Sequence, residues 1–390
     1  MDASGRRARL AARHHLSPGS LAASPVDASR DLVGLHGTDP LTVHLSTWAR
    51  VRDFQTTDLE RALYEDRSLL KLIGMRETLF VVPIELAAII QAACTKSYAG
   101  SERPRLAKMI REAGISDDPE RWIEALEAET LAVLHTKGEA TAAELTKEIE
   151  GLRSQIPFGA GKAWQGTVGV STRLLFLLAG EGRIVRGRPK GTVVPSLYRW
   201  APMDRWVAGG LPPMSRGDAQ AELVRRYLAT FGPATLADIR WWTGWTAAEV
   251  RGAISAIGPV EIDMDGGSIG YLLPDDLEPI AAPAEPWVAL LPALDPTIMG
   301  WQERSWYLGS HRPALFDRNG NAGPTIMLDG RVVGGWVQRR DGEIAWRLLE
   351  DVGAGARALV EQRAAELRAW LGDLRCIPRF RTPLEQELSV

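Results

Sequence analysis

Polar capping residues and apolar positions with helical spacing predict two short helices joined by a tight turn between Phe231 and Ile257. Thr235 can cap the first helix, and Gly244 can end it, because glycine adopts the left-handed conformation of a sharp stop. Thr246 can cap the second helix, with Glu249 at the capping-box spacing. Its expected apolar face contains Ala248, Val250, Ala253, Ile254 and Ile257. Such a pair of helices is typical of proteins that present side chains to a DNA groove.

The same plan occurs earlier in the chain. Thr141 stands at the capping-box spacing from Glu144, and a helix over about Thr167–Leu178 is expected to follow. Gly182–Trp200 then predicts two strands around a basic loop, and Val260–Leu273 predicts a second hairpin after the first-described helices. These patterns predict two winged-helix units, and we expect a third near the N-terminus.

The remaining segments predict a largely helical start and a β-rich end. Four short helices and one strand pair are expected in the first hundred residues: helices near Ala28–Gly34, Thr42–Val51, Thr56–Tyr64 and Pro83–Cys94, with the strand pair in Ser68–Pro83. Trp287–Trp301 and Pro324–Arg340 are strand-like, Asp329-Gly330 is a strong hairpin turn signal, and one helix over about Ala354–Leu371 closes the chain.

Proline- and glycine-rich stretches divide this order into domains. The boundaries fall at Pro202–Asp218 and Glu278–Pro286. We therefore predict an N-terminal winged-helix-like unit (1–115), two further winged-helix units (116–205 and 216–278), and a β-rich domain with a closing helix (285–390). The fold class is α+β. Tryptophans of the last domain are expected in its core or rim, since aromatic residues in sheets usually pack.

Composition excludes several classes of protein. A chain of 390 residues with 45% hydrophobic and 24% charged residues fits a soluble protein of several domains. Cys94 and Cys376 are the only cysteines, which argues against a disulfide scaffold and a cysteine-ligated zinc site. No apolar stretch approaches the roughly 20 residues of a membrane helix, and the basic N-terminus lacks the apolar core of a signal peptide. We therefore expect a cytoplasmic protein.

The net charge of −3 does not indicate nucleic-acid binding, but the cations are clustered. Four cations and no anion occur between Arg183 and Lys190, and Arg339-Arg340 occupies a predicted hairpin turn. Candidate phosphate contacts are Arg186, Arg188, Lys190, Arg339 and Arg340. The alternative is that these side chains are ordinary solvated loop residues.

Four segments together resemble one family. They are Leu32–Phe54, Gly74–Pro83, Ala289–Ser305 and Met327–Arg340, and they are similar to bacterial DNA glycosylases of the AlkZ/YcaQ type, which remove bulky alkylated bases and open interstrand crosslinks. The resemblance covers almost the whole chain. It implies three tandem winged-helix units and a small β domain in a C-shape around a DNA-sized channel. It also implies a protein that binds double-stranded DNA carrying alkylated purines, without a metal or an organic cofactor, and it adds Arg76 and Arg304 as phosphate contacts. Several winged-helix units in one chain favour a monomer.

The family's catalytic signature is Gln-X-Gln or Gln-X-Asp directly after a Gly-Leu pair like Gly34-Leu35. Here His36 and Thr38 hold those positions, and Asp39 lies one residue beyond. Base excision breaks the C1′–N bond through an oxocarbenium-like transition state, and an N7- or N3-alkylated purine leaves readily because it is already cationic. A group that places or deprotonates water then suffices. His36 can do so near neutral pH, since histidine has a usual pKa of about 6.5, and Thr38 or Asp39 would assist it.

Geometry supports this assignment, and simpler interpretations stay open. In an extended segment His36 and Thr38 would face the same side and hold one water together. However, a histidine before a turn is often only a structural hydrogen-bond partner, and Asp39 before Pro40 is typical of a helix cap. His44 is expected within a helix, and His135 and His311 are isolated, so no metal site is predicted. Two other functions remain: a non-catalytic DNA-binding protein, such as a regulator or lesion binder, and a protein-interaction scaffold.

Overall fold

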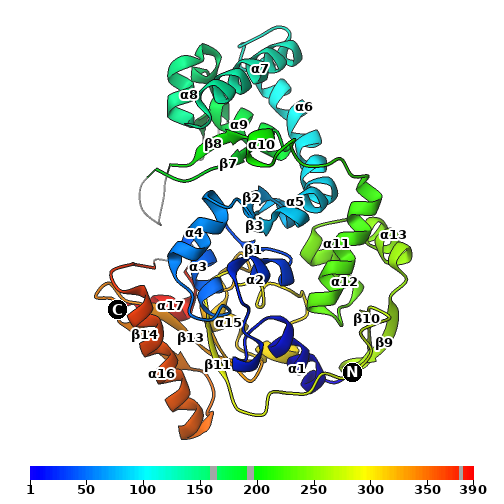
Figure 1. Ribbon diagram of the computed structural model, residues 1–390, viewed down its shortest axis with the longest axis vertical. Coiled ribbons are helices and arrows are strands. Elements are labelled where there is room, and N and C mark those ends of the chain that lie inside the picture. Colours follow the sequence, from blue (N-terminus) through cyan, green and yellow to red (C-terminus); the bar gives the residue numbers. More distant parts are fainter. Residues whose placement is uncertain (159–164, 191–196, 377–380) are drawn as a thin grey trace. The chain divides into compact units, whose positions relative to one another are not determined.

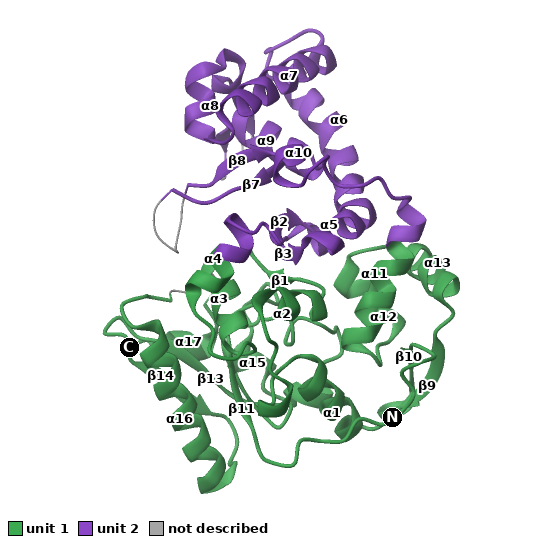
Figure 2. Ribbon diagram, in the orientation of Figure 1, with its two compact units in different colours: residues 1–60, 220–390 green, residues 61–219 purple. Residues whose placement is uncertain are grey.

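The structure, a computed structural model, describes residues 1–158, 165–190, 197–376 and 381–390 (Figure 1). The chain mixes helices and strands and divides into two compact units (Figure 2). Unit 1 contains residues 1–60 and 220–390, and unit 2 contains residues 61–219. This division is coarser than the four predicted domains, which stay a prediction. Within the described ranges, no helix has both the length and the apolar character needed to cross a membrane.

The N-terminal part of unit 1 is helical, as predicted. Its elements are α1 (Ala3–Arg13), α2 (Pro25–Asp31), the short strand β1 (Leu35–His36), α3 (Pro40–Trp48) and α4 (Thr56–Tyr64), within which the chain enters unit 2. The bounds of α4 agree with the prediction, whereas α2 and α3 begin earlier. In both cases a capping side chain and a proline at the first helical position fix the start, Ser24 before α2 and Asp39 before α3.

Two short helices joined by a tight turn lie where the capping residues predict them. The segment contains α11 (Arg216–Phe231), α12 (Leu236–Thr243), α13 (Ala247–Ile257), β9 (Val260–Met264) and β10 (Ser268–Leu272). Thr235 with Asp238, and Thr246 with Glu249, form two capping boxes. Gly244 has a φ of 78°, the left-handed conformation that the stop after α12 requires. Local sequence signals therefore determine this part of the fold.

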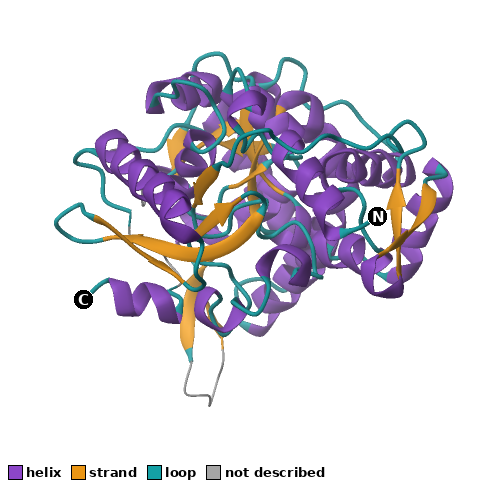
Figure 3. Cartoon of the chain, turned by 90° about the horizontal axis from the view of Figure 1, so that it is seen from below, coloured by secondary structure: helices purple, strands orange, loops and turns teal. Residues whose placement is uncertain are grey.

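Side chains of these helices form much of the core around them. Trp242 and Trp245 are buried. On α13, Val250 and Ala253 are buried, but Ala248 is exposed because it lies on the outer side of the helix with Arg251. The N-terminus lies beside the β9–β10 hairpin (Figure 3), where Ala3 N donates to Asp265 Oδ2 at 2.8 Å.

The C-terminal part of unit 1 is an antiparallel sheet with the strand order β11-β12-β13-β14. These strands are β11 (Val288–Leu291), β12 (Thr325–Leu328), β13 (Arg331–Gln338) and β14 (Ile344–Leu348), followed by helices α16 (Gly353–Leu371) and α17 (Pro383–Leu388). Asp329 and Gly330 have φ values of 48° and 78°, so they form the two-residue turn that Asp-Gly predicts.

The predicted strand over Trp287–Trp301 is wrong beyond Leu291. Pro292 and Pro296 lack backbone donors, and the chain from 292 to 301 forms turns instead. Two short helices, α14 (Ser305–Leu308) and α15 (Arg312–Leu315), fill the connection to β12. Trp287, Trp301 and Trp336 are buried in this region, as predicted for its tryptophans.

Unit 2 combines helices with three small sheets. Its elements are β2 (Leu69–Ile73), β3 (Leu79–Pro83), α5 (Ile84–Ile90), α6 (Lys96–Glu112), α7 (Pro119–Lys137), β4 (Ala140–Thr141), α8 (Ala142–Glu148), β5 (Gln155–Phe158), β6 (Gly166–Gly169), α9 (Val170–Gly180), β7 (Ile184–Arg186), β8 (Arg199–Pro202) and α10 (Met203–Trp206). β2 and β3 form the predicted antiparallel pair, and Thr141 and Glu144 form the predicted capping box.

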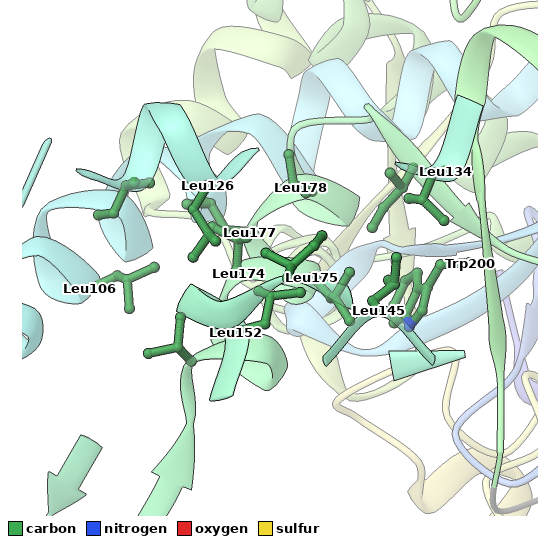
Figure 4. Close-up of a cluster of buried hydrophobic side chains, with 14 of the residues drawn as sticks. Leu106, Leu126, Leu134, Leu145, Leu152, Leu174, Leu175, Leu177, Leu178 and Trp200 are labelled. Carbon is green, nitrogen blue, oxygen red and sulfur yellow. The ribbon is translucent and has the colours of Figure 1, made fainter. Parts of the chain in front are cut away.

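The core of unit 2 is a leucine-rich cluster contributed by α6, α7, α8 and α9 (Figure 4). The predicted helix over Thr167–Leu178 begins only at Val170, because Gly166–Gly169 pairs with β5 as a strand. Helix α6 was not predicted, since Gly100 and Pro104 interrupt its pattern, although Leu106, Ala107 and Ile110 bury one face at helical spacing.

Candidate functional site

The segment from His36 to Asp39, called here the 36–39 segment, connects β1 to α3 in unit 1. His36 is only 5% exposed, whereas Thr38 and Asp39 are half-buried. The extended conformation ends at His36, because the chain bends at Thr38 and Asp39. No strand therefore sets His36 and Thr38 on the same side, contrary to the argument from an extended segment. Asp39 and Thr38 are the more accessible members of the segment.

Asp39 begins α3. Its Oδ1 accepts a hydrogen bond from the Leu41 backbone N–H at 2.9 Å, so it is the cap that Asp39-Pro40 predicts. The capping bond thus holds a half-buried carboxyl group at a fixed place directly after His36 and Thr38.

The C-terminal end of the chain reaches the surroundings of Asp39. The pKa of the Cys376 thiol is raised, first by burial and then by the negative charges of Asp39 and Glu385, so both carboxyl groups lie near this thiol. Cys376 N donates to Gln338 Oε1 at 2.7 Å, which ties it to the end of β13. The 36–39 segment and the β13–β14 turn therefore belong to one neighbourhood in unit 1.

The β13–β14 turn carries Arg339 and Arg340 as predicted, but the two side chains differ. Arg339 donates to Leu388 O at 3.0 Å and forms an ion pair with Glu343 at 3.3 Å. Arg340 is exposed and forms no ion pair with another described residue. Arg340 is thus the arginine of this pair that can take a phosphate without giving up an existing partner.

Arg375 also lies at this turn. Its Nε donates to Arg340 O at 3.2 Å, and its Nη1 donates to Gly372 O at 2.9 Å. A Cβ added at Gly342 would lie 3.2 Å from its guanidinium, so the group packs closely on the turn. Backbone carbonyls therefore hold an exposed arginine beside Arg340. Residues far apart in sequence create this arrangement, and no local pattern signals it.

Arg304 does not lie at the surface. It is 7% exposed, its Nε donates to Ile298 O at 3.1 Å, and its guanidinium carbon lies 4.4 Å from the centroid of the Trp241 ring. Burial lowers its pKa, which reflects the cost of taking the cation out of water. This geometry assigns Arg304 to the core of unit 1, contrary to the phosphate contact expected from its place in the motif.

In unit 2, Arg186 and Arg188 contact aromatic rings. Arg186 lies 4.6 Å from the Tyr198 centroid, and its pKa is lowered by burial against the opposing effect of Tyr198. Arg188 is exposed, lies 5.2 Å from the Tyr64 centroid and forms an ion pair with Glu65 at 3.0 Å. Lys190 is exposed and has no ion pair with a residue that the structure describes.

Other cations of the basic segment are partly neutralised. Arg183 pairs with the buried Glu127 at 2.8 Å, and Arg199 pairs with Glu139 at 2.6 Å. Burial first, and then Glu181, raises the pKa of Glu127 despite its cationic partners. The charge run read from the sequence therefore overstates the positive charge of this loop. Its remaining part, residues 191–196, lies outside the described residues.

The remaining candidates from the sequence are Arg76 and three histidines. Arg76 is half-buried within a short turn and has a φ of 52°. His44 is 7% exposed, and its Nδ1 lies 3.1 Å from Pro40 O. His311 lies 3.2 Å from Glu350, and His135 lies 3.7 Å from Asp204. Among the described residues, no three histidine, cysteine or acidic side chains are grouped so that they could hold a metal ion.

Comparison with known proteins gives two matches. A family model described as DNA glycosylase AlkZ-like matches residues 29–370. Among solved structures, Streptomyces sahachiroi DNA glycosylase AlkZ matches with a TM-score of 0.74 and 23% sequence identity, over 95% of this chain and 97% of that chain. No curated protein matches the chain by sequence. The structural match shows a shared fold, and the family match includes the 36–39 segment and the β13–β14 turn.

Proposed function

The chain belongs to the AlkZ-like DNA glycosylase family, and from this we propose that it hydrolyses the N-glycosidic bond of bulky or cationic alkylated purines in duplex DNA. Family membership carries the proposal, and it agrees with the resemblance read from the sequence. The residue types also support it, because an imidazole, a hydroxyl and a carboxylate follow one another in the 36–39 segment, at the place of the family's catalytic signature.

We interpret two sets of elements as winged-helix units. One contains α11, α12 and α13 with the β9–β10 hairpin, and the other contains α7, α8 and α9 with the β7–β8 pair. In such units the second of the two short helices and the hairpin loop contact DNA. Lys190 in one unit, and Arg340 with Arg375 near the 36–39 segment, are our proposed phosphate contacts. We propose that the protein acts as a monomer, since tandem units in one chain need no partner subunit.

The proposed reaction needs one activated water. Its oxygen attacks C1′, the C1′–N bond breaks, and the bonding pair leaves with the alkylated purine, whose positive charge is thereby neutralised. The water proton passes to the Asp39 carboxylate, and the Thr38 hydroxyl orients the water. We assign His36, which is 5% exposed, to stabilising the conformation of the 36–39 segment. Water rather than an amine is the nucleophile, so the enzyme is monofunctional.

Incubation with duplex DNA carrying N7-methylguanine or a bulkier N7 adduct tests the proposal. Base release leaves abasic sites, which heat or alkali converts into strand breaks. We expect such breaks with wild-type protein and fewer with Asp39→Asn at unchanged DNA binding. An interstrand crosslink through N7 extends the test: cleavage of the same bond would separate the strands on a denaturing gel. Binding without base release on every adduct would contradict the proposal.

A second function has one observation in its favour. The family glutamines are absent, and the histidine in the first of these positions is almost fully buried. Both facts suit a protein that binds lesions without excising them. His36→Gln distinguishes the two functions, because it restores the family's side chain at this position. An enzyme should retain or gain base release, whereas a lesion binder should release no base with either residue.

A further inference from the structure

Three polar residues of α3 and the turn after it form a stripe that the proposed reaction does not use. Thr42 and Ser46 lie four residues apart on one face of α3, and Arg50 follows in the turn just beyond its end at Trp48. All three bind the segment Ala293–Thr297, which lies in one of the motifs singled out in the sequence. Thr42 Oγ1 donates to Ala293 O at 3.2 Å, and Ser46 Oγ donates to Asp295 Oδ2 at 2.9 Å.

Asp295 is the centre of this contact. Arg50 binds it with two hydrogen bonds, Nη2 to Oδ1 at 2.6 Å and Nη1 to Oδ2 at 2.8 Å, and both side chains are fully buried. The Thr297 backbone N–H adds a bond to Oδ1 at 2.9 Å. With Ser46, four donors occupy the carboxylate, which fills its acceptor sites. The two parallel hydrogen bonds from Arg50 to Asp295 form only at one relative position of α3 and the segment Ala293–Thr297, so they disfavour other positions.

The network continues to α1. Arg50 Nη2 also donates to Thr297 Oγ1 at 2.7 Å, and His14 Nδ1 lies 2.8 Å from the same hydroxyl. His14 is fully buried, and its ring is stacked on Trp301. The Thr297 hydroxyl thus links the Arg50–Asp295 pair to a buried residue of α1.

We propose that Asp295 is a positioning residue for base release. Through Ser46 and Arg50 it fixes the register of α3, and α3 begins at Asp39. A shift or rotation of this helix would move the Asp39 carboxylate and the adjoining Thr38 relative to a bound nucleotide. This role rests on the proposed function for its effect on the reaction, but its effect on the 36–39 segment does not depend on activity.

The test replaces the whole ion pair, because removal of one partner would strand a buried charge. Arg50→Met with Asp295→Leu removes both charges. The matched control is Arg9→Met and Arg13→Met with Asp276→Leu, which removes a second, mostly buried group of charges (Arg9–Asp276 at 2.7 Å, with Arg13 on the same carboxylate) that links α1 to the segment after β10. Hydrogen exchange of peptides spanning residues 37–43 reports on the Leu41 amide that binds Asp39. Single-turnover base release and duplex binding are measured on the same proteins.

We expect faster exchange at residues 37–43 and base release slowed by about 10²-fold in the Arg50/Asp295 variant, with duplex binding unchanged, since small misplacement of reacting groups has effects of this size. The control should keep both properties. Unchanged exchange and rate in the Arg50/Asp295 variant would overturn the role of Asp295. If wild-type protein releases no base, the proposed function fails, and the exchange measurement alone decides whether Asp295 positions the segment.

Discussion

Asp39 combines two roles at one position: it caps α3 and is our proposed acceptor of the water proton. The cap is visible as the bond from Leu41 N–H to Oδ1 at 2.9 Å. Its neighbour His36, at 5% exposure, has less access to a substrate than the sequence suggested. We therefore assign the role of water-activating group to the Asp39 carboxylate instead of the His36 imidazole.

Substitution can separate the two roles of Asp39. Asparagine caps helices about as well as aspartate, so Asp39→Asn should leave the free energy of unfolding nearly unchanged, whereas Asp39→Ala should lower it by about 1 kcal/mol. Urea denaturation of the three proteins measures the difference. Equal destabilisation by Asn and Ala would mean that the negative charge, rather than the capping bond, stabilises α3.

Buried His14 predicts a pH dependence of stability. Burial, and then the charge of Arg50, lowers its pKa well below that of the unfolded chain. Below about pH 6.5 His14 is protonated in the unfolded chain but stays neutral in the folded protein. The free energy of unfolding therefore falls with decreasing pH, by up to about 1.4 kcal/mol per pH unit. Above pH 6.5 both states are neutral, and this contribution vanishes.

Denaturation between pH 7.5 and 5 checks this prediction, followed by the fluorescence of tryptophans such as Trp301, which stacks on His14. His14→Gln is the matched variant, because an amide keeps a hydrogen-bonding side chain but does not titrate. The loss of stability towards pH 5 should be smaller in the variant than in the wild type. Identical pH profiles would contradict a neutral, buried His14.

At the scale of elements, the β13–β14 turn is the basic surface that we propose to contact DNA beside the 36–39 segment. We expect Arg340→Ala and Arg375→Ala each to reduce the slope of log K against log salt by about 0.9, since each removed phosphate contact releases about one counterion fewer. Binding of an undamaged duplex at several salt concentrations gives the slope. Arg339→Ala with Glu343→Ala removes an existing pair without changing net charge and should leave it unaltered. Slopes unchanged by both Arg340→Ala and Arg375→Ala would rule out this surface.

The loop after β7 makes a separate prediction for unit 2. In this loop, Lys190 is exposed and forms no ion pair with a described residue. Lys190→Ala should therefore also lower the slope of log K against log salt by about 0.9. The charge-balanced control is Arg199→Ala with Glu139→Ala, which removes a pair 2.6 Å apart. If the control variant bound DNA as weakly as Lys190→Ala does, the shape of the loop rather than the charge of Lys190 would be what DNA binding requires.

For the whole molecule, the sequence was most informative where structure is determined locally. The two capping boxes around Thr235 and Thr246, the stop at Gly244 and the Asp329-Gly330 turn all follow from side chains acting on nearby backbone. Helix α6 was missed because its interior Gly100 and Pro104 interrupt the pattern that its buried face would otherwise show.

The candidate site was less predictable, because its contacts join distant parts of the chain. Asp295 lies 245 positions from Arg50, and Arg375 lies 35 positions from the carbonyl of Arg340. Burial depends equally on such packing: no local pattern shows that Arg304 is internal while Arg340 is exposed. The residue types of the 36–39 segment were legible, but their relative access to a substrate was not.

One measurement tests the central claim most directly: single-turnover release of N7-methylguanine from duplex DNA by the wild type and Asp39→Asn, with binding of the same duplex followed in parallel. The account predicts base release by the wild type and a rate roughly 10²–10⁴-fold lower in the variant, the range of general-base assistance, at equal affinity. Equal rates for both proteins would remove Asp39 from the mechanism, and no release by either would contradict a glycosylase that acts on this lesion.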